Sequence, residues 1–403
     1  METDNLYINN ALDWLKRAVD SLVSHKRTDE GTGFIRSSKQ IIPEQKEGIF
    51  YTATFQAYSA LLESAETYEA GAFGLKEMTL ELTHIFTPDI FGKKDQYSTN
   101  NGSRSIILLE QILKVMVYLQ KYRHTIGEDI INAAKEAIDI ETAKTDILSN
   151  SANDEYYYPE ASRSPWFLLS LLNCQKYIET IYGDANGIIK IPSVDTLIDS
   201  HINYHMARYN VKELSFDPIS LVIALCCKIT RDPGFKTSPF CISCLEAIVK
   251  LQYNDGCWPT GATISFDDSG DVIQQASIQI ASQLAEAIID YKFLVDCNDN
   301  VEQVLDIIIP SFRKLFNYIT ATFEKLDNPC VYGWSSDRIK LKGYTETWIT
   351  AYTCRFLYKY WLAEKAYARI KALKRLGVTN YVYDEQNTIC LLYTSPSPRD
   401  RQK

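Results

Sequence analysis

Apolar positions along this chain recur with the 3.6-residue period of helices, and they do so in two alternating kinds of segment. The more apolar segments begin, at intervals of about 55 residues, near Phe50, Ser105, Arg163, Phe216, Asp271 and Tyr344. The more polar, amphipathic segments lie between them, at 11–24, 74–85, 126–138, 194–207, 240–251 and 301–323. The alternation predicts twelve helices arranged as six helical hairpins.

Strand signals are scarce by comparison. Short β-rich pieces at 187–191 and 381–383 are interpreted as the edges of loops. Six hairpins suit a closed ring, with the apolar helices inside and the amphipathic ones outside, because an open solenoid would need polar capping repeats at both ends. The expected fold is therefore all-α, an (α/α)6 toroid that forms a single domain over residues 1–389.

The connection after the fifth amphipathic segment carries the clearest motif. Residues 251–261 read LQYNDGCWPTG, and degraded copies of this Gly-aromatic turn occur at 11–34 and 311–334. In physical terms Gln252 can satisfy backbone groups at a helix end, Gly256 permits a tight turn, and Trp258 can pack against the next hairpin. We expect the Trp258 and Trp334 turns to lie on the same rim of the ring.

Gln252, Asp255, Gly256 and Trp258 resemble the glutamine-tryptophan repeat of the terpenoid cyclase and protein prenyltransferase superfamily. The resemblance implies an α/α toroid, the fold of that superfamily. Because the roles of the motif are structural, it supports the fold much more than an activity.

Charge and composition limit the classes of partner and the location that the chain can have. The net charge of -9 argues against a nucleic-acid partner, because phosphate binding relies on Lys and Arg. No apolar run is long enough to span a membrane, and the N-terminus METDNLYINN is unlike a signal peptide, so a cytoplasmic protein is expected. The ten cysteines have irregular spacings that favour reduced, mostly buried thiols.

The end of the chain departs from the helical pattern. The segment CLLYTSPSPRD, residues 390–400, is similar to the conceptual translation of a sequencing-library adapter. We expect residues 390–403 to be a non-native, disordered tail, and the native protein to be truncated near Ile389, with any fused domain beyond it missing.

A ring of hairpins gathers the N-termini of its inner helices at one mouth, where free backbone N–H groups and positive dipole ends are presented. The loops expected there are rich in charged and aromatic residues, and acidic residues at such positions can also serve merely as helix caps. The candidate ligand- or partner-binding residues are Glu160, Arg163, Trp258, Asp271, Asp337, Arg338, Glu346 and Trp348, with Asp267 and Asp268 as candidate catalytic residues.

The acidic run at 267–271, Asp-Asp-Ser-Gly-Asp, is comparable to two cyclase motifs. A magnesium-binding Asp-Asp-x-x-Asp run would lie on a helix, whereas the Ser and Gly here favour a loop. The proton-donating Asp-x-Asp-Asp run of class II cyclases is matched by Ser265-Phe266-Asp267-Asp268, in which the first Asp is missing. Asp267 is the residue that would donate the proton in such an enzyme.

Metal sites are not predicted. Asp255 and Cys257 match part of a zinc prenyltransferase ligand set, but no His follows them in the chain. Cys241 and Cys244 lie on a continuous helix, which favours buried thiols over zinc ligands. His201 and His205 are one helical turn apart without the Glu of a metalloprotease motif, and solvated histidines on a helix face are expected.

Three functional interpretations remain. The first is a toroid that binds a small apolar or amphiphilic ligand, a protein partner or a fused domain, without a cofactor; 26 tyrosines supply aromatic surface for a cavity. The second is a variant class II isoprenoid cyclase with Asp267 as the acid. The third is a carbohydrate-active toroid that uses paired carboxylates and aromatic platforms. A dry aromatic funnel around Asp267 would favour the cyclase. An open groove with two facing carboxylates would favour the carbohydrate enzyme, and a cavity filled by side chains would favour an interaction protein.

Overall fold

A computed structural model of the chain describes its helical segments and several of the connections between them. The described residues are 2–27, 33–35, 37–38, 50–65, 75–92, 103–122, 125–146, 165–182, 194–210, 218–258, 265–266, 272–273, 278–290, 293–294, 299–327, 330–335, 343–377, 382–383 and 389–390.

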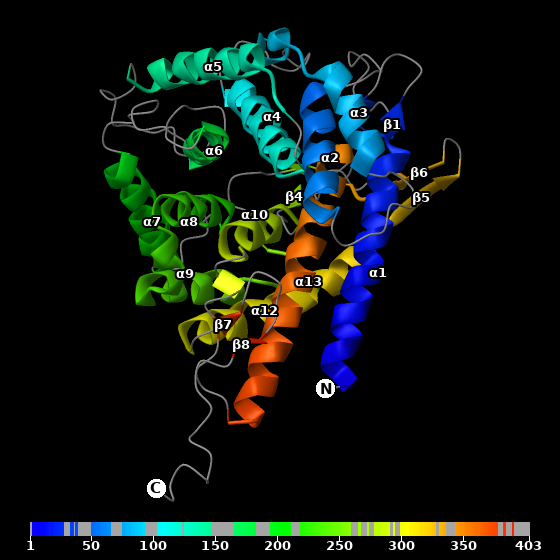
Figure 1. Ribbon diagram of the computed structural model, residues 1–403. Helices are drawn as coiled ribbons and strands as arrows, with labels where there is room; N and C mark the ends of the chain where they lie inside the picture. The colour runs from blue at the N-terminus through cyan, green and yellow to red at the C-terminus, as the bar shows by residue number, and fades with distance from the viewer. Residues whose placement is uncertain are drawn as a thin grey trace, which may run out of the picture.

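The described residues form twelve α-helices, which confirms the all-α fold class (Figure 1). The amphipathic set is α1 (Glu2–Ser24), α3 (Leu75–Ile85), α5 (Glu128–Asp146), α7 (Val194–Asn210), α9 (Pro239–Lys250) and α12 (Asp299–Ala321). The more apolar set is α2 (Tyr51–Ser64), α4 (Ser103–Lys121), α6 (Pro165–Tyr182), α8 (Pro218–Arg231), α10 (Ile278–Ile288) and α13 (Thr347–Arg375). The two sets alternate along the chain as the periodicity predicts, and two short 3-10 helices, η1 (Pro88–Gly92) and η2 (Pro233–Thr237), lie in connections.

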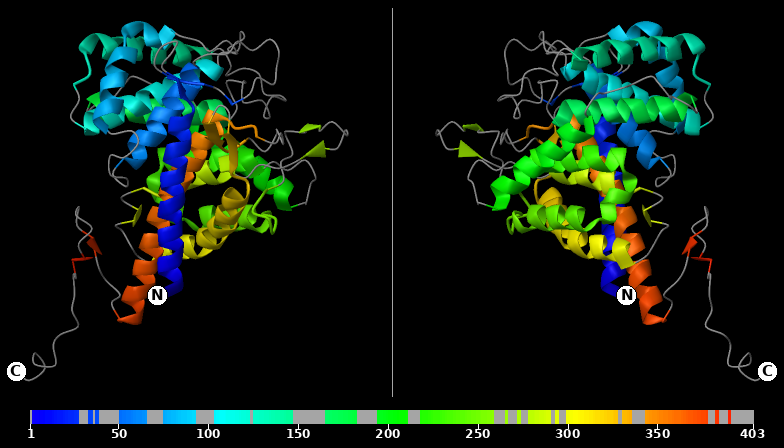
Figure 2. Two further views of the ribbon diagram at one scale, coloured as in Figure 1. Left: turned by 90° about the vertical axis from the view of Figure 1, so that its right-hand side faces the viewer. Right: turned by 90° about the vertical axis from the view of Figure 1, so that its left-hand side faces the viewer.

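The more apolar helices contact one another in a closed cycle. Helix α2 packs on α4, α4 on α6, α6 on α8, α8 on α10, α10 on α13, and α13 again on α2. We call these six the ring helices. Among the amphipathic helices, α1 lies along α13 over much of its length, as Figures 1 and 2 show, α7 packs on α8, and α5 contacts both α4 and α6.

The strands of the described residues form four two-stranded antiparallel sheets. They are β1 (Lys26–Arg27) with β2 (Gly33–Phe34), β3 (Ser265–Phe266) with β4 (Val272–Ile273), β5 (Glu324–Asp327) with β6 (Cys330–Gly333), and β7 (Val382–Tyr383) with β8 (Ile389–Cys390). Helix α10 begins at Ile278, later than the expected start near Asp271, because the β-branched pair Val272 and Ile273 pairs with β3.

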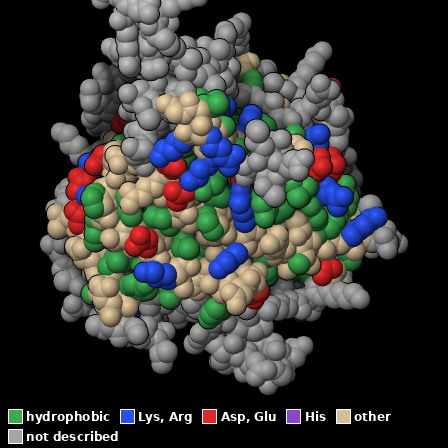
Figure 3. All heavy atoms as spheres, turned by 90° about the horizontal axis from the view of Figure 1, so that it is seen from below, with side chains coloured by type: hydrophobic (Ala, Val, Ile, Leu, Met, Phe, Trp, Pro, Cys, Tyr) green, Lys and Arg blue, Asp and Glu red, His purple; other side chains and the backbone are tan. Residues whose placement is uncertain are grey.

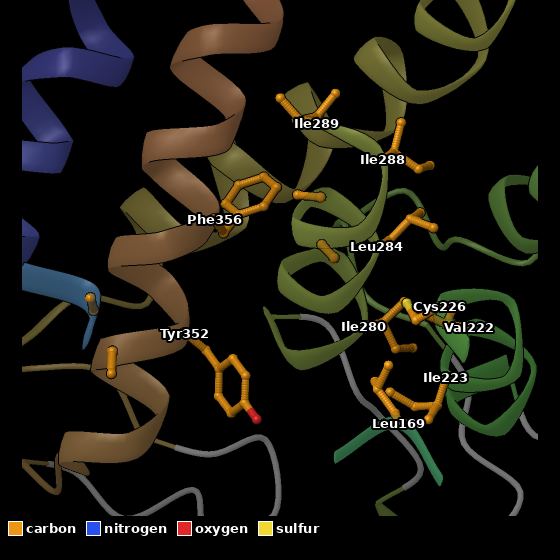
Figure 4. Close-up of a cluster of buried hydrophobic side chains, with 14 of the residues drawn as sticks. Leu169, Val222, Ile223, Cys226, Ile280, Leu284, Ile288, Ile289, Tyr352 and Phe356 are labelled. Atoms are coloured by element: carbon orange, nitrogen blue, oxygen red, sulfur yellow. The ribbon is translucent and has the colours of Figure 1, made fainter. Parts of the chain in front are cut away.

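The hydrophobic core draws buried side chains from all twelve helices. Figure 4 shows one part of it, where Ile280 and Leu284 of α10 lie close to Val222 and Cys226 of α8. Tyr352 and Phe356 of α13 lie on the other side of α10 in the same view. The core therefore connects neighbouring ring helices directly.

In the turn after α9, Gln252 and Trp258 make different hydrogen bonds from those expected. The indole N–H of Trp258 donates to the carbonyl of Ile248 in the last turn of α9, at 2.8 Å, so Trp258 satisfies the helix end. The side-chain amide of Gln252 instead donates to the carbonyls of Gly256, at 3.0 Å, and of Ser311 in α12, at 3.1 Å. Gln252 is therefore the residue that links the turn to the next amphipathic helix.

Gly256 is required in this turn for two reasons. Its φ of +96° is unfavourable for residues with a side chain, and a Cβ would lie 2.7 Å from the carbonyl oxygen of Lys314. The turn before α13 repeats the arrangement, since the indole N–H of Trp334 donates to the carbonyl of Ile319 in the last turn of α12 at 2.8 Å. Both tryptophans are fully buried, so each of the two turns places an indole against the last turn of the helix before it.

The expectation of solvated histidines on α7 is wrong. His201 and His205 are 1% and 0% exposed, and they share a buried face with Ile198 and Ile202. The reason is that α7 packs this face against α8. Burial lowers the pKa of His205 to about 3, because the charged form would have to leave water.

Candidate functional site

Seven of the residues expected at the mouth lie outside the described residues: Glu160, Arg163, Asp267, Asp268, Asp271, Asp337 and Arg338. Their convergence stays a prediction. The other three, Trp258, Glu346 and Trp348, have defined positions. Trp258 is fully buried in the turn after α9, where its packing and hydrogen bond give it a structural role.

Glu346 and Trp348 both lie at the start of α13. The backbone N–H of Glu346 donates to the carbonyl of Trp334 at 2.8 Å, and its buried carboxylate accepts a hydrogen bond from the hydroxyl of Tyr344 at 3.2 Å. The ring of Trp348 lies edge-on to that of Tyr352, with centroids 6.0 Å apart. These contacts fix the N-terminal end of one ring helix, where the mouth is expected.

A buried network of charged side chains joins the ring helices further along their length. Glu63 of α2 lies 3.5 Å from Lys114 of α4 and 3.0 Å from Lys359 of α13. Lys114 also contacts Glu286 of α10 at 2.9 Å. Because α4 and α10 are on opposite sides of the contact cycle, the pair of Lys114 and Glu286 bridges the interior.

Arg355 of α13 is the most enclosed cation of this network, with only 2% of its side chain exposed. It donates to the carbonyl of Gln56 at 3.3 Å, to the side-chain oxygen of Gln111 at 2.5 Å, and to the hydroxyl of Ser59. Its guanidinium also lies 3.5 Å from Glu286. The fixed planar guanidinium thus connects α13 to α2, α4 and α10.

The carboxyl groups of the network have contrasting environments. Burial alone would raise the pKa of Glu63, but the nearby charges of Lys114, Lys359 and Arg355 outweigh it and bring the pKa to about 2. Glu110 of α4 instead accepts hydrogen bonds from the hydroxyl of Ser170 at 2.6 Å and from the amide of Asn173 at 2.8 Å. Burial raises the pKa of Glu110, and these two neutral donors only partly offset it.

A pocket of about 310 Å³ adjoins the network at the C-terminal ends of α6, α8 and α10. Glu286 and Asn173 contribute to both the network and the pocket wall. The wall is partly apolar, with Leu169, Leu172, Cys226, Ile229 and Ala287, and partly polar, with Lys176, Tyr177, Lys236 and Asp290 among others. This pocket lies at the ends of these helices opposite to those where the mouth is expected.

Sequence reasoning missed the network, although a signal was present. On ring helices, polar residues recur four positions apart within apolar stretches: Ser59 and Glu63, Glu110 and Lys114, Asn173 and Tyr177, and Arg355 and Lys359. Residues four apart share one face of a helix, so each pair marks the side that faces the other ring helices. The search for charge in the loops passed over these pairs.

Other classes of site receive no support from the described residues. None of them forms a group of three or more His, Cys, Asp or Glu side chains that could hold a metal ion, and none of the helices they form is long and apolar enough to cross a membrane. Seven cysteines are buried free thiols: Cys174, Cys226, Cys227, Cys241, Cys244, Cys257 and Cys354. Figure 3 shows the molecule from below the view of Figure 1. On this face, hydrophobic, acidic and basic side chains are interspersed, and no one kind covers it.

Comparisons with protein-family models and with curated proteins find no match for this chain. The geometry of the network and the pocket therefore carries the functional argument.

Proposed function

We propose that the chain is an (α/α)6 toroid, related in design to terpenoid cyclases and protein prenyltransferases, that binds a small amphiphilic ligand in the pocket at the C-terminal ends of α6, α8 and α10. The toroid is supported by the alternation of helices, by the closed cycle of contacts between ring helices, and by the buried Trp258 and Trp334 turns.

The observation that carries the ligand proposal is the pocket wall. Apolar side chains such as Leu172 and Ile229 and charged ones such as Lys176 and Glu286 line one cavity of about 310 Å³, a volume within the range of small-molecule sites. The ion pair of Lys114 and Glu286 crosses the interior beside the pocket, so we expect the ligand to enter from the helix ends. A ligand with both an apolar part and a polar head fits such a wall best.

The alternative of an isoprenoid cyclase finds less support in this part of the chain. A carbocation intermediate needs a dry aromatic surface, whereas the described interior holds ion pairs of Glu63, Lys114 and Arg355 with their neighbours. Asp267 lies outside the described residues, so its role as a proton donor stays a prediction.

A neutral fluorescent amphiphile, prodan, tests the pocket. We expect it to bind saturably with one site per chain, and Ala287→Trp, which fills the pocket, to abolish the bound-state emission. Ile140→Trp on the exposed face of α5, where the side chain is 55% exposed, is the matched control and should leave binding unchanged. Circular dichroism verifies that each variant is folded. Equal binding to wild type and a folded Ala287→Trp variant would refute a site in this pocket.

A further inference from the structure

The charged groups of the pocket wall are almost all engaged in contacts within the protein. Lys236 forms an ion pair with Asp290, and Arg231 contacts Asp195 of α7 through two hydrogen bonds of 3.1 and 3.0 Å. Glu286 is held by Lys114 and Arg355. Of the exposed acids, Glu179 accepts a hydrogen bond from Gln175 at 3.0 Å. A ligand that needed one of these groups would have to break an existing contact.

Lys176 and Tyr177 differ from the rest of the wall. Among the residues that the structure describes, the ammonium group of Lys176 and the hydroxyl of Tyr177 form no hydrogen bond or ion pair, and both residues line the pocket. They belong to the last two turns of α6, next to each other in the sequence. The pocket therefore offers a cationic donor and a neutral donor that are already free to bind.

One carboxylate and three ammonium groups act on the charge of Lys176. Desolvation lowers the pKa of Lys176; the carboxylate of Asp290 raises it, and the ammonium groups of Lys236, Lys359 and Lys114 lower it. The opposing carboxylate, Asp290, is already paired with Lys236. An anion placed beside Lys176 would therefore relieve repulsion between cations, whereas a cation placed there would add to it.

The C-terminal ends of the helices disfavour an anion in the pocket, but their effect is weaker than that of Lys176. The C-termini of α6 and α8 border the pocket and present the equivalent of about half a negative elementary charge each, an effect that falls off within the last turn. Lys176 carries a full charge, and it lies in the wall itself. The burial of Tyr177 raises its pKa well above the usual value, so its hydroxyl stays protonated and able to donate.

We infer that the pocket selects its ligand through an anionic head group, a carboxylate or a phosphate, bound by the ammonium of Lys176 and the hydroxyl of Tyr177, while the apolar side chains of the wall hold the remainder of the molecule. The inference rests on the proposed function, and it specifies the class of amphiphile. Lys236, Lys114 and Lys359 already form ion pairs with the nearby carboxylates of Asp290, Glu286 and Glu63.

Three amphiphiles with the same eight-carbon chain test the head group: octanoate, octyl phosphate and octanol, each measured by displacement of prodan at constant ionic strength. We expect the preferred anion to bind at least about tenfold more tightly than octanol, the gain typical of one charge-assisted contact. Comparison of the two anions distinguishes a carboxylate from a phosphate site. Tyr177→Phe should weaken the anions by a smaller factor.

Variants at Lys176 separate charge from packing. Lys176→Ala should remove the preference for the anion while octanol binds as before, and Lys176→Arg should keep the preference. The matched control is Lys16→Ala on α1, which removes the same charge from an exposed position outside the pocket and should change neither affinity.

The outcomes distinguish the inference from the proposal on which it rests. If octanol and prodan bind but no anion is preferred, or if the preference survives in Lys176→Ala, the anionic head group is refuted and the amphiphile pocket stands. If neither prodan nor any of the three amphiphiles binds to folded protein, both are refuted.

Discussion

The buried histidine at the junction of α1 and α13 should make the protein sensitive to mild acid. His25 is fully buried; one ring nitrogen lies 2.9 Å from the carbonyl oxygen of Ser21, and the other lies 2.9 Å from the hydroxyl of Thr345. Burial is the main cause that lowers the pKa of His25 from 6.5 to about 4. The folded state therefore holds a neutral imidazole through a pH range in which the unfolded chain takes up a proton.

The sign and size follow from proton linkage. Because the unfolded state binds more protons between pH 6.5 and about 4, the free energy of unfolding falls as the pH falls through this window. The stabilisation is complete above pH 6.5. At about 1.4 kcal/mol per pKa unit, His25 should account for a loss of about 2 kcal/mol between pH 7 and pH 5. His205, whose pKa is about 3, should contribute a similar loss over the same interval.

Urea unfolding followed by circular dichroism at pH 7, 6 and 5 measures this loss. We expect His25→Gln to be less stable than wild type at pH 7, since Gln cannot reproduce both ring contacts, but to lose about 2 kcal/mol less on acidification. His84→Gln on the exposed side of α3 is the control and should keep the wild-type slope. Glu110, whose pKa burial raises, changes stability in the opposite sense, so the difference between variants is the informative quantity. A His25→Gln protein with the same pH dependence as wild type would refute the neutral buried imidazole.

Three substitutions test the turns and the charged network through denaturant unfolding. Gly256→Ala should cost more than the roughly 1–3 kcal/mol of backbone strain alone, because its Cβ would also meet a carbonyl oxygen, whereas Gly377→Ala, at a φ of +73° with no atom within 4 Å, should cost the strain only. Equal losses of stability in Gly256→Ala and Gly377→Ala would show that the close approach of residue 256 to the carbonyl of Lys314 is unimportant. Glu63→Gln should destabilise by about 3–5 kcal/mol, as expected when one partner of a buried ion pair is removed, because Lys359 is left uncompensated and Lys114 keeps Glu286 alone; a loss below about 1 kcal/mol would mean that water reaches Lys359. Trp334→Phe keeps an aromatic ring but leaves the carbonyl of Ile319 without the indole donor, so a loss of about 1–3 kcal/mol in the free energy of unfolding is expected. An unchanged unfolding midpoint would show that this hydrogen bond does not stabilise the fold.

Much of the architecture could be predicted from local patterns. The period of apolar residues located all twelve helices, and the alternation of more and less apolar segments separated the ring helices from the amphipathic ones. A helix is specified within a few turns of chain, so a single sequence carries this information. Gly256 and Trp258 likewise identified a tight turn, because a positive φ and a buried indole are local demands.

Local patterns could not say which distant side chains would meet. The sequence contains Lys114 and Glu286 as isolated charges in apolar helices 172 positions apart, and only the packing of α4 opposite α10 makes them an ion pair. The same limit explains His205, since a polar helix face is assigned to solvent until a second helix covers it. Even within the recognised turn, the helix end was assigned to Gln252 and only packing to Trp258, because the partner carbonyl of Gln252, that of Ser311, belongs to another helix.

The candidate site follows the same division. The residues expected at the mouth were chosen because a charged loop can be recognised from the sequence alone, while the pocket requires Lys176 of α6, Glu286 of α10 and the connection that holds η2 to converge. Hydrophobic period and turn chemistry act over a few residues and set the helices, their order and their apolar faces. The pairing of buried charges and the shape of a cavity depend on how those helices close on one another, and that closure is a property of the whole packed chain.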